Sequence, residues 1–195
     1  MTALRRNNVH VLGQGKETMV FAHGYGCDQN MWRLLTPAFA ERYRIVLFDL
    51  VGCGKSDLSA YDYEKYAKLH GHAADVLDIL REVSDGPTVF VGHSVSAMIG
   101  TLAAIEEPSR FASLVMIGPS PCYVNDGDYV GGFSRSDIDS LLNTLDSNYL
   151  GWASAMAPQI MGVPDRPELR AELTNSFCAT DPDIAKHFAR TTFLS

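Results

Sequence analysis

Ser94 lies between two small residues in the stretch V-F-V-G-H-S-V-S-A-M-I-G, which runs from Val89 to Gly100. The residues before Ser94 are apolar, as in a buried strand, and the residues after it predict an apolar helix. A sharp strand-to-helix turn presents a serine hydroxyl to a pocket, and Gly92 and Ser96 are small enough to flank such a turn. The pattern predicts a nucleophile elbow with Ser94 as catalytic nucleophile of acyl transfer. An ordinary buried turn serine is the alternative.

A second stretch, H-G-Y-G-C-D-Q, follows the apolar run Met19–Ala22. A His-Gly turn at the end of a strand beside the elbow is where an oxyanion hole is built. We expect the backbone N–H groups of Tyr25 and Val95 to hold the developing negative oxygen. A glycine-rich turn with structural duties only is the alternative. Structural support of this turn is the role predicted for His23, Gly24 and Gly26.

A third stretch, F-D-L-V-G-C-G-K-S-D, runs from Phe48 to Asp57. Its glycine spacing matches neither G-x-x-x-x-G-K-[ST] nor G-x-G-x-x-G, so phosphate binding is disfavoured. Asp49 is a candidate for a triad acid. We prefer the interpretation that its carboxylate supports the loop by accepting hydrogen bonds from backbone N–H groups.

Short apolar runs predict the strands that position these motifs. They occupy Val9–Leu12, Met19–Ala22, Ile45–Phe48, Val89–Val91 and Leu114–Ile117. The last four are apolar almost throughout, as strands buried on both faces are. Helical spacing occurs in Trp32–Tyr43, in Tyr66–Leu80 and in Ala97–Ile105, and the last of these predicts a buried helix. The alternation predicts an α/β fold with a mainly parallel sheet.

From about Ser134 the pattern predicts four helices and no strand. The first begins with Ser134-x-x-Asp137, and the fourth begins with a capping Asp181 before Pro182. We expect these helices to form a lid over the carboxyl edge of the sheet, with a core in residues 1–118 and the lid in 119–195. If Leu114–Ile117 is the last strand, its outer edge is unpaired, which indicates that further core strands are absent.

Composition excludes several classes of function. The net charge of −7 argues against nucleic-acid or anionic-membrane partners. No apolar run approaches the roughly 20 residues of a membrane span, and the N-terminus lacks the apolar segment of a signal peptide. The spacing of the cysteines indicates neither a zinc site nor a disulfide framework. We expect a cytoplasmic protein with reduced thiols, whose cysteines are Cys27, Cys53, Cys122 and Cys178.

The three motifs together resemble the α/β-hydrolase superfamily. With V-M-I-G-P-S-P-C-Y and F-C-A-T-D-P, they are similar to its RsbQ-type branch of bacterial stress-response regulators, which is related to the karrikin and strigolactone receptors of plants. The resemblance implies a sheet with a V-shaped four-helix lid and a Ser-Asp-His triad over a small, mostly apolar pocket. It also implies slow hydrolysis tied to ligand sensing and a signalling partner, in bacteria a phosphatase of the RsbP type.

The histidine and acid of such a triad are not evident in this sequence. The triad order in this fold is nucleophile, acid, histidine, and only His187 follows Ser94. His187 lies on the predicted fourth lid helix, where a loop-borne base is not expected, and His93 is expected to point away from the turn. The resemblance places acid and base beyond Ser195, so we expect roughly the last quarter of the fold to be missing.

Three hypotheses follow for function. The first is a serine hydrolase that acts on a small apolar ester or lactone, with a regulatory role. The second is a non-catalytic ligand-binding regulator, and the third is a truncated, inactive paralogue. No cofactor is expected, because acyl transfer by serine needs neither a metal nor an organic group.

Overall fold

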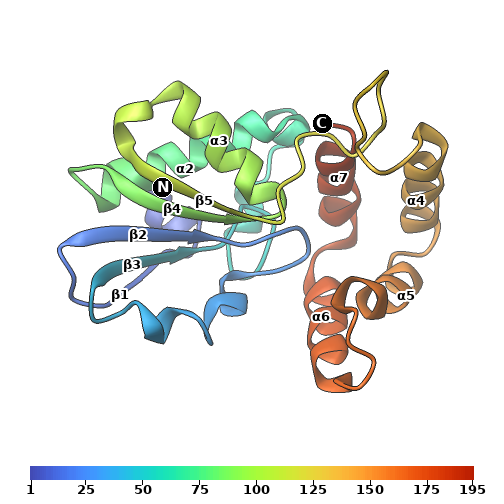
Figure 1. The fold of residues 1–195 in the computed structure, drawn as a ribbon, viewed down its shortest axis with the longest axis horizontal. Helices are drawn as coiled ribbons and strands as arrows, with labels where there is room; N and C mark the ends of the chain where they lie inside the picture. Colours follow the sequence, from blue (N-terminus) through green and yellow to red (C-terminus); the bar gives the residue numbers. More distant parts are fainter.

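The computed structural model describes all residues from Met1 to Ser195. Five strands form one sheet in the order β1-β3-β2-β4-β5 (Figure 1). Only β1 runs antiparallel to its neighbour, and the other three pairings are parallel. The strand bounds are β1 His10–Leu12, β2 Glu17–Ala22, β3 Tyr43–Phe48, β4 Thr88–His93 and β5 Phe111–Ile117. The α/β fold and the mainly parallel sheet predicted from the apolar runs are therefore confirmed.

One prediction about the strands is wrong. The apolar run in β5 predicts burial on both faces, but Val115, Met116 and Ile117 are 43%, 48% and 40% exposed. The reason is the position of β5 at the edge of the sheet, where only β4 pairs with it. An apolar sequence indicates a strand that can be covered, and it does not say whether a neighbour covers it.

Helices and turns cover the two faces of the sheet differently (Figure 1). The helices α2 (Leu69–Val83) and α3 (Val95–Glu106) pack on one face, against Val20, Val46 and Phe90. The other face carries Phe21 and Ile45, which pack with Trp32. A short helix α1 (Ala3–Arg6), which the pattern did not predict, precedes β1.

Two predicted helices differ from the structure. The Trp32–Tyr43 spacing predicts an α-helix, but the chain forms two 3₁₀ turns, Gln29–Trp32 and Thr36–Ala38. Pro37 stands in the second turn, where its missing N–H prevents a continuous helix. The helix α3 is apolar but not fully buried, because Ile105 on its outer side is 73% exposed.

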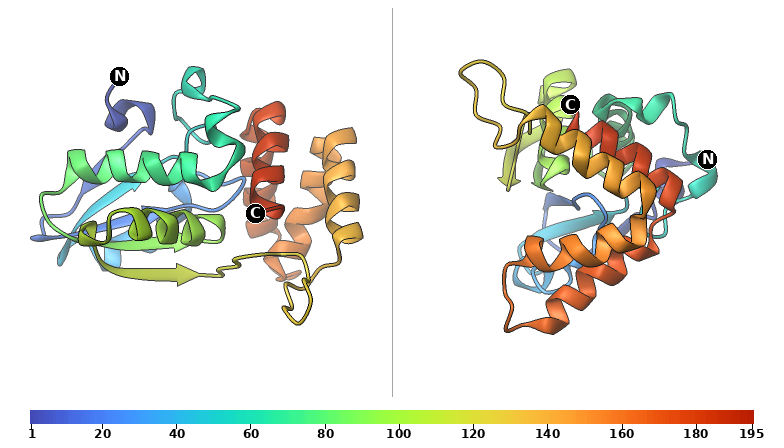
Figure 2. Two further views of the ribbon diagram at one scale, coloured as in Figure 1. Left: turned by 90° about the horizontal axis from the view of Figure 1, so that it is seen from above. Right: turned by 90° about the vertical axis from the view of Figure 1, so that its right-hand side faces the viewer.

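The four predicted lid helices are present and lie at the end of the sheet where the parallel strands finish (Figures 1 and 2). Ser134 and Asp137 form a reciprocal capping box at α4, and the Asp181 carboxylate caps α7, as predicted. These helices have an apolar core of their own, which includes Leu142, Trp152 and Phe177. Their bounds are α4 Arg135–Ser147, α5 Tyr149–Met161, α6 Pro167–Ala179 and α7 Pro182–Phe193.

We call α4 to α7 the lid. The division at residue 118 into a core and a lid domain stays a prediction. No helix in the structure combines the length and the apolar character needed to cross a bilayer.

Candidate active site

Ser94 occupies the turn between β4, which ends at His93, and α3, which begins at Val95. Its backbone is held at φ 55° and ψ −124°, a conformation that non-glycine residues rarely adopt. Such a residue costs about 1–3 kcal/mol and persists only where its surroundings fix it. One fixing contact is the Ser94 N–H, which donates to the carbonyl oxygen of Ile117 at 2.8 Å. The local geometry is that of a sharp strand-to-helix turn.

Gly92 allows this turn to be tight. A Cβ atom at Gly92 would lie 2.6 Å from the carbonyl oxygen of Ser96 and 2.7 Å from the backbone nitrogen of Ala97. Both neighbours are backbone atoms and have little freedom to move. Only glycine fits between β4 and the first turn of α3, which is the physical basis of the small residue expected there.

The loop after β2 lies directly beside Ser94. The parallel pairing of β2 with β4 places Ala22 opposite Gly92, so both strands end at the same edge. A Cβ atom at Gly24 would lie 3.3 Å from Cβ of Ser94 and 2.6 Å from Nδ1 of His93. The loop approaches the serine this closely because Gly24 has no side chain.

Both backbone groups predicted as oxyanion donors are free to donate. The N–H of Tyr25 makes no hydrogen bond to any backbone or side-chain acceptor. The N–H of Val95 stands at the first position of α3, where an α-helix offers no acceptor, and no loop carbonyl takes it. Two free donors beside one serine can stabilise negative charge on an oxygen bonded to that serine's substrate.

His23 is fully buried beneath the loop, with both ring nitrogens engaged. Its Nδ1 donates to the carbonyl oxygen of Gly24 at 2.9 Å, and its Nε2 accepts from the Leu50 N–H at 3.0 Å. Burial lowers the pKa of His23, so the ring is neutral. Ser96 donates its hydroxyl proton to the His23 carbonyl oxygen. These contacts support the loop and leave His23 no free nitrogen with which to act as a base.

The Asp49 carboxylate is buried and holds three segments together. Its Oδ1 accepts from the Gln29 N–H at 2.9 Å, while its Oδ2 accepts from the Asn8 side chain at 2.7 Å and from the Lys55 N–H at 2.9 Å. It makes no hydrogen bond to a histidine. The geometry matches the preferred interpretation of Asp49 as a structural carboxylate that supports the loop.

No histidine or carboxylate forms a hydrogen bond with the Ser94 hydroxyl. His187 instead pairs its Nδ1 with the Tyr61 hydroxyl at 2.8 Å, and its ring stands edge-on to Tyr61 and Tyr63. The His93 ring lies against Gly24, so the expectation that it points away from the turn is wrong. Its Nδ1 is buried without a partner, and burial lowers its pKa.

A cavity of about 790 Å³ lies beside the serine rather than over it. Its lining comes from the start of α2, from α3 and from α7, and includes Leu69, Met98, Leu102, His187 and Arg190. Neither Ser94 nor Tyr25 lines it, so it is not the pocket expected over the nucleophile. No group of three or more His, Cys, Asp or Glu side chains lies close enough together to hold a metal ion, and all four cysteines are free.

Residues 17–150 match the family model described as alpha/beta hydrolase fold. The chain is 41% identical over 189 residues to a karrikin insensitive 2 receptor of Petunia hybrida, covering 97% of this chain and 70% of that protein. It is 38% identical over 189 residues to a strigolactone esterase of Pisum sativum, covering 96% and 70%. Among solved structures, a hydrolase from Oleispira antarctica gives a TM-score of 0.95 at 44% identity, covering 99% of this chain and 71% of that one.

Proposed function

This chain belongs to the α/β-hydrolase fold family, and on that premise we propose that Ser94 is the nucleophile of a hydrolase for small apolar esters or lactones. The observation that carries the proposal is the strained backbone of Ser94 beside two free N–H groups, those of Tyr25 and Val95. Strain of this kind is characteristic of functional sites, because it presents a side chain at a fixed place.

In the proposed reaction, Oγ of Ser94 attacks the carbonyl carbon of the ester, and the hydroxyl proton is passed to a base. The carbonyl oxygen becomes negative and accepts hydrogen bonds from the N–H groups of Tyr25 and Val95. Collapse of the intermediate breaks the bond to the leaving alcohol, which takes up the proton, and leaves an acyl-serine. Water then releases the acid and restores Ser94. Loss of one oxyanion donor typically costs about 10²–10³ in rate.

The base and acid that this reaction needs do not contact Ser94 in the structure. The resemblance to the family places them after Ser195, and that placement stays a prediction. A triad serine hydrolase that lacks one member retains only about 10³–10⁴ of rate over water. We therefore expect the 195-residue chain to acylate slowly at Ser94, through the oxyanion donors alone.

The substrate class follows from the side chains between the loop and the lid. Five aromatic rings meet there, and they favour an apolar ligand over a charged one. Two relatives are by name a karrikin receptor and a strigolactone esterase, which supports a small ligand and a regulatory role. The finer resemblance to RsbQ-type regulators, and a phosphatase of the RsbP type as partner, stay predictions. The rings are Tyr25, Trp152, Phe177, Phe188 and Phe193.

A second candidate function is ligand binding without turnover. The observation that favours it is the absence of any histidine or carboxylate bonded to the Ser94 hydroxyl. Ligand-dependent stabilisation against heat, with no product formed, supports the binding hypothesis. A chain that neither binds ligand nor stays monomeric supports the inactive paralogue.

The experiment that tests the hydrolase is labelling by a fluorophosphonate, which phosphonylates activated serines. We expect slow labelling of the wild-type chain and none of Ser94→Ala. The matched control is Ser154→Ala, because the Ser154 hydroxyl is exposed on α5 and bonds only to Leu150 of its own helix. Labelling that persists in Ser94→Ala overturns the assignment, and a wild-type chain that takes no label favours ligand binding.

A further inference from the structure

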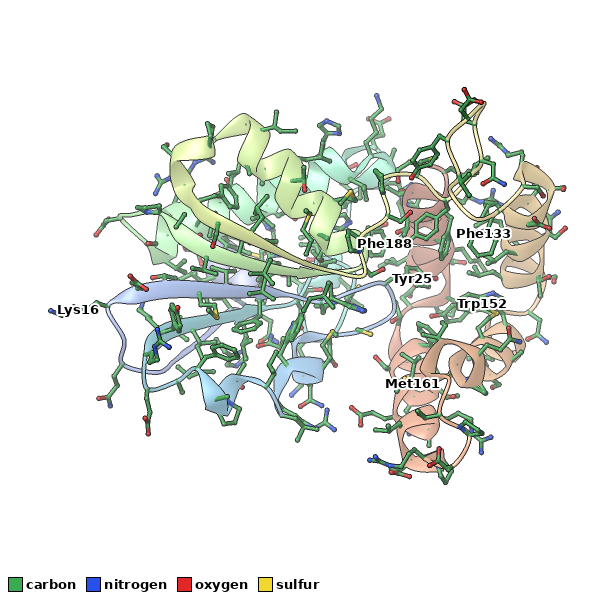
Figure 3. All side chains as sticks on the ribbon, viewed as in Figure 1. Lys16, Tyr25, Phe133, Trp152, Met161 and Phe188 are labelled. Atoms are coloured by element: carbon green, nitrogen blue, oxygen red, sulfur yellow. The ribbon has the colours of Figure 1, made fainter.

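Tyr25 joins the lid to the core of the sheet. Its ring packs against both apolar clusters, the one under α2 and α3 and the one inside the lid. The ring centroids of Phe188 and Phe193 lie 5.7 Å and 5.9 Å away, and that of Trp152 lies 6.2 Å away. Figure 3 shows Tyr25 at the boundary between sheet and lid, with Phe188 and Trp152 on the lid side. No other side chain borders both clusters.

The Tyr25 hydroxyl extends this contact with a hydrogen bond. It donates to the carbonyl oxygen of Ala185 in α7 at 2.9 Å. Burial raises the pKa of Tyr25, so the hydroxyl keeps its proton and stays a donor. One residue thus carries an oxyanion donor on its backbone and a bond to the lid on its side chain.

The next residue is attached to a different lid helix. The Ser176 hydroxyl of α6 donates to the carbonyl oxygen of Gly26 at 2.7 Å. Gly26 has φ +68°, and a Cβ atom there would lie 2.0 Å from the Phe177 ring. The lid therefore presses on the loop at Gly26 and leaves room only for glycine.

These attachments are the only hydrogen bonds of Tyr25 and Gly26 to other parts of the chain. On the core side, the nearest loop contacts are the His23 ring bonded to the Gly24 carbonyl and the Cys27 N–H bonded to the same oxygen. Neither of them holds the peptide group between Gly24 and Tyr25 in a fixed orientation. The direction of the Tyr25 N–H thus depends on helices that are more than 140 residues away in sequence.

We propose that Tyr25 and Ser176 are positioning residues, whose hydroxyl groups fix the oxyanion loop to the lid and make the oxyanion hole dependent on the place of the lid. A lid in the observed place aims the Tyr25 N–H at Ser94. A lid displaced by a ligand or a partner releases the loop and removes that donor. The inference rests on the proposed function, and it makes the lid a regulatory element of the same site.

The test removes each hydroxyl alone, in Tyr25→Phe and Ser176→Ala. The controls remove hydroxyls of the same kind whose bonds stay inside the lid. Tyr149→Phe deletes a 2.7 Å bond to the Phe177 carbonyl, and Thr174→Ala deletes a bond to Arg170 within α6. Each variant is labelled over a series of fluorophosphonate concentrations, which separates the binding of the reagent from the rate of bond formation.

We expect Tyr25→Phe and Ser176→Ala to slow bond formation between about 10-fold and 10²-fold, below the 10²–10³ for complete loss of a donor. Reagent binding should change little, because the ring of Tyr25 remains. Tyr149→Phe and Thr174→Ala should label like the wild type. Ser176→Thr, which keeps a hydroxyl, should restore most of the rate.

A second measurement separates this inference from the proposed function. Amide hydrogen exchange over residues 23–29 needs no chemistry at Ser94, and it should become faster in Tyr25→Phe and Ser176→Ala but not in the controls. If the wild type takes no label, the proposed function fails and exchange alone decides whether the loop is attached to the lid. Unchanged exchange in both test variants overturns the inference. Faster exchange with an unchanged labelling rate of a labelled wild type overturns it as well.

Discussion

Gly24 shows how little space the candidate site leaves. An added Cβ would meet Nδ1 of His93 at 2.6 Å and Cβ of Ser94 at 3.3 Å, so either the loop or the serine must move. We expect Gly24→Ala to lower the rate of phosphonate labelling by about 10²-fold, the usual effect of a 1 Å misplacement in a catalytic arrangement. The measurement is the labelling rate, with the free energy of unfolding in urea measured alongside.

The matched control for this substitution is Gly86→Ala, because a Cβ at Gly86 meets no heavy atom within 4 Å. It should label at the wild-type rate. If Gly24→Ala also labels at that rate and unfolds like the wild type, the loop is not held against Ser94 as described. The glycine would then have no steric role at the site.

The residues of the turn were predictable because their requirement is local. A strand, a serine between small residues and an apolar helix are adjacent in sequence, so the pattern predicts the strained position of Ser94 directly. The free state of the Tyr25 N–H follows from the same local geometry. The attachment of Tyr25 to Ala185 was not predictable, because nothing in a tyrosine indicates which carbonyl its hydroxyl meets 160 residues later.

At the scale of elements, α2 and α7 enclose a buried histidine. His72 of α2 is fully buried between the Tyr66 and Phe188 rings, with centroids 4.5 Å and 4.8 Å away, and neither ring nitrogen has a partner. Burial lowers the pKa of His72 from its ordinary 6.5 to about 3, and the positive charge of Lys65 lowers it further. The folded chain therefore contains neutral His72 throughout the range in which the unfolded chain takes up a proton.

This gives a pH dependence with a definite sign. Below pH 6.5 the unfolded state binds a proton at His72 that the folded state does not, so stability falls as the pH falls toward 3. At pH 5 the loss from this residue is about 2 kcal/mol, at 1.36 kcal/mol per pH unit. We expect the drop in unfolding free energy between pH 7 and pH 5 to be smaller by that amount in His72→Phe.

The measurement is urea unfolding of both proteins at the two pH values. His23, whose pKa burial also lowers, is present in both proteins and cancels in the comparison. An equal drop in the two proteins would mean that His72 takes up a proton in the folded state or titrates alike in both states.

The predictions for whole elements succeeded where the pattern was strong. The capping residues Ser134 and Asp181 marked two lid helices, because a cap is a local hydrogen bond. The spacing of Trp32 and Phe39 failed to predict its structure, because two successive 3₁₀ turns bury these side chains as well as one helix does. Apolar spacing reports which residues are covered more reliably than it reports the kind of turn between them.

The whole molecule exposes an apolar strand at one edge. Val115 of β5 is 43% exposed, and the free edge offers backbone groups to any strand that approaches. We expect the 195-residue chain to self-associate as its concentration rises, and we expect Val115→Lys to reduce that association. Sedimentation velocity over an approximately tenfold range of concentration measures both.

The control is Val11→Lys at the opposite edge, where Val11 is 46% exposed on a strand of three residues. A strand this short offers few backbone groups for pairing, so Val11→Lys should associate like the wild type. Equal association of Val115→Lys and the wild type would show that β5 is not the contact.

The central claim for the molecule is that Ser94 is its nucleophile. Trypsin releases residues 82–110 as one peptide, because no lysine or arginine lies between Arg81 and Arg110. Mass spectrometry of the fluorophosphonate-treated chain can therefore locate the adduct within that peptide. We predict a single phosphonate on Ser94, with Ser84, Ser96 and Ser109 unmodified. An adduct on any other residue, with Ser94 unmodified, would contradict the claim.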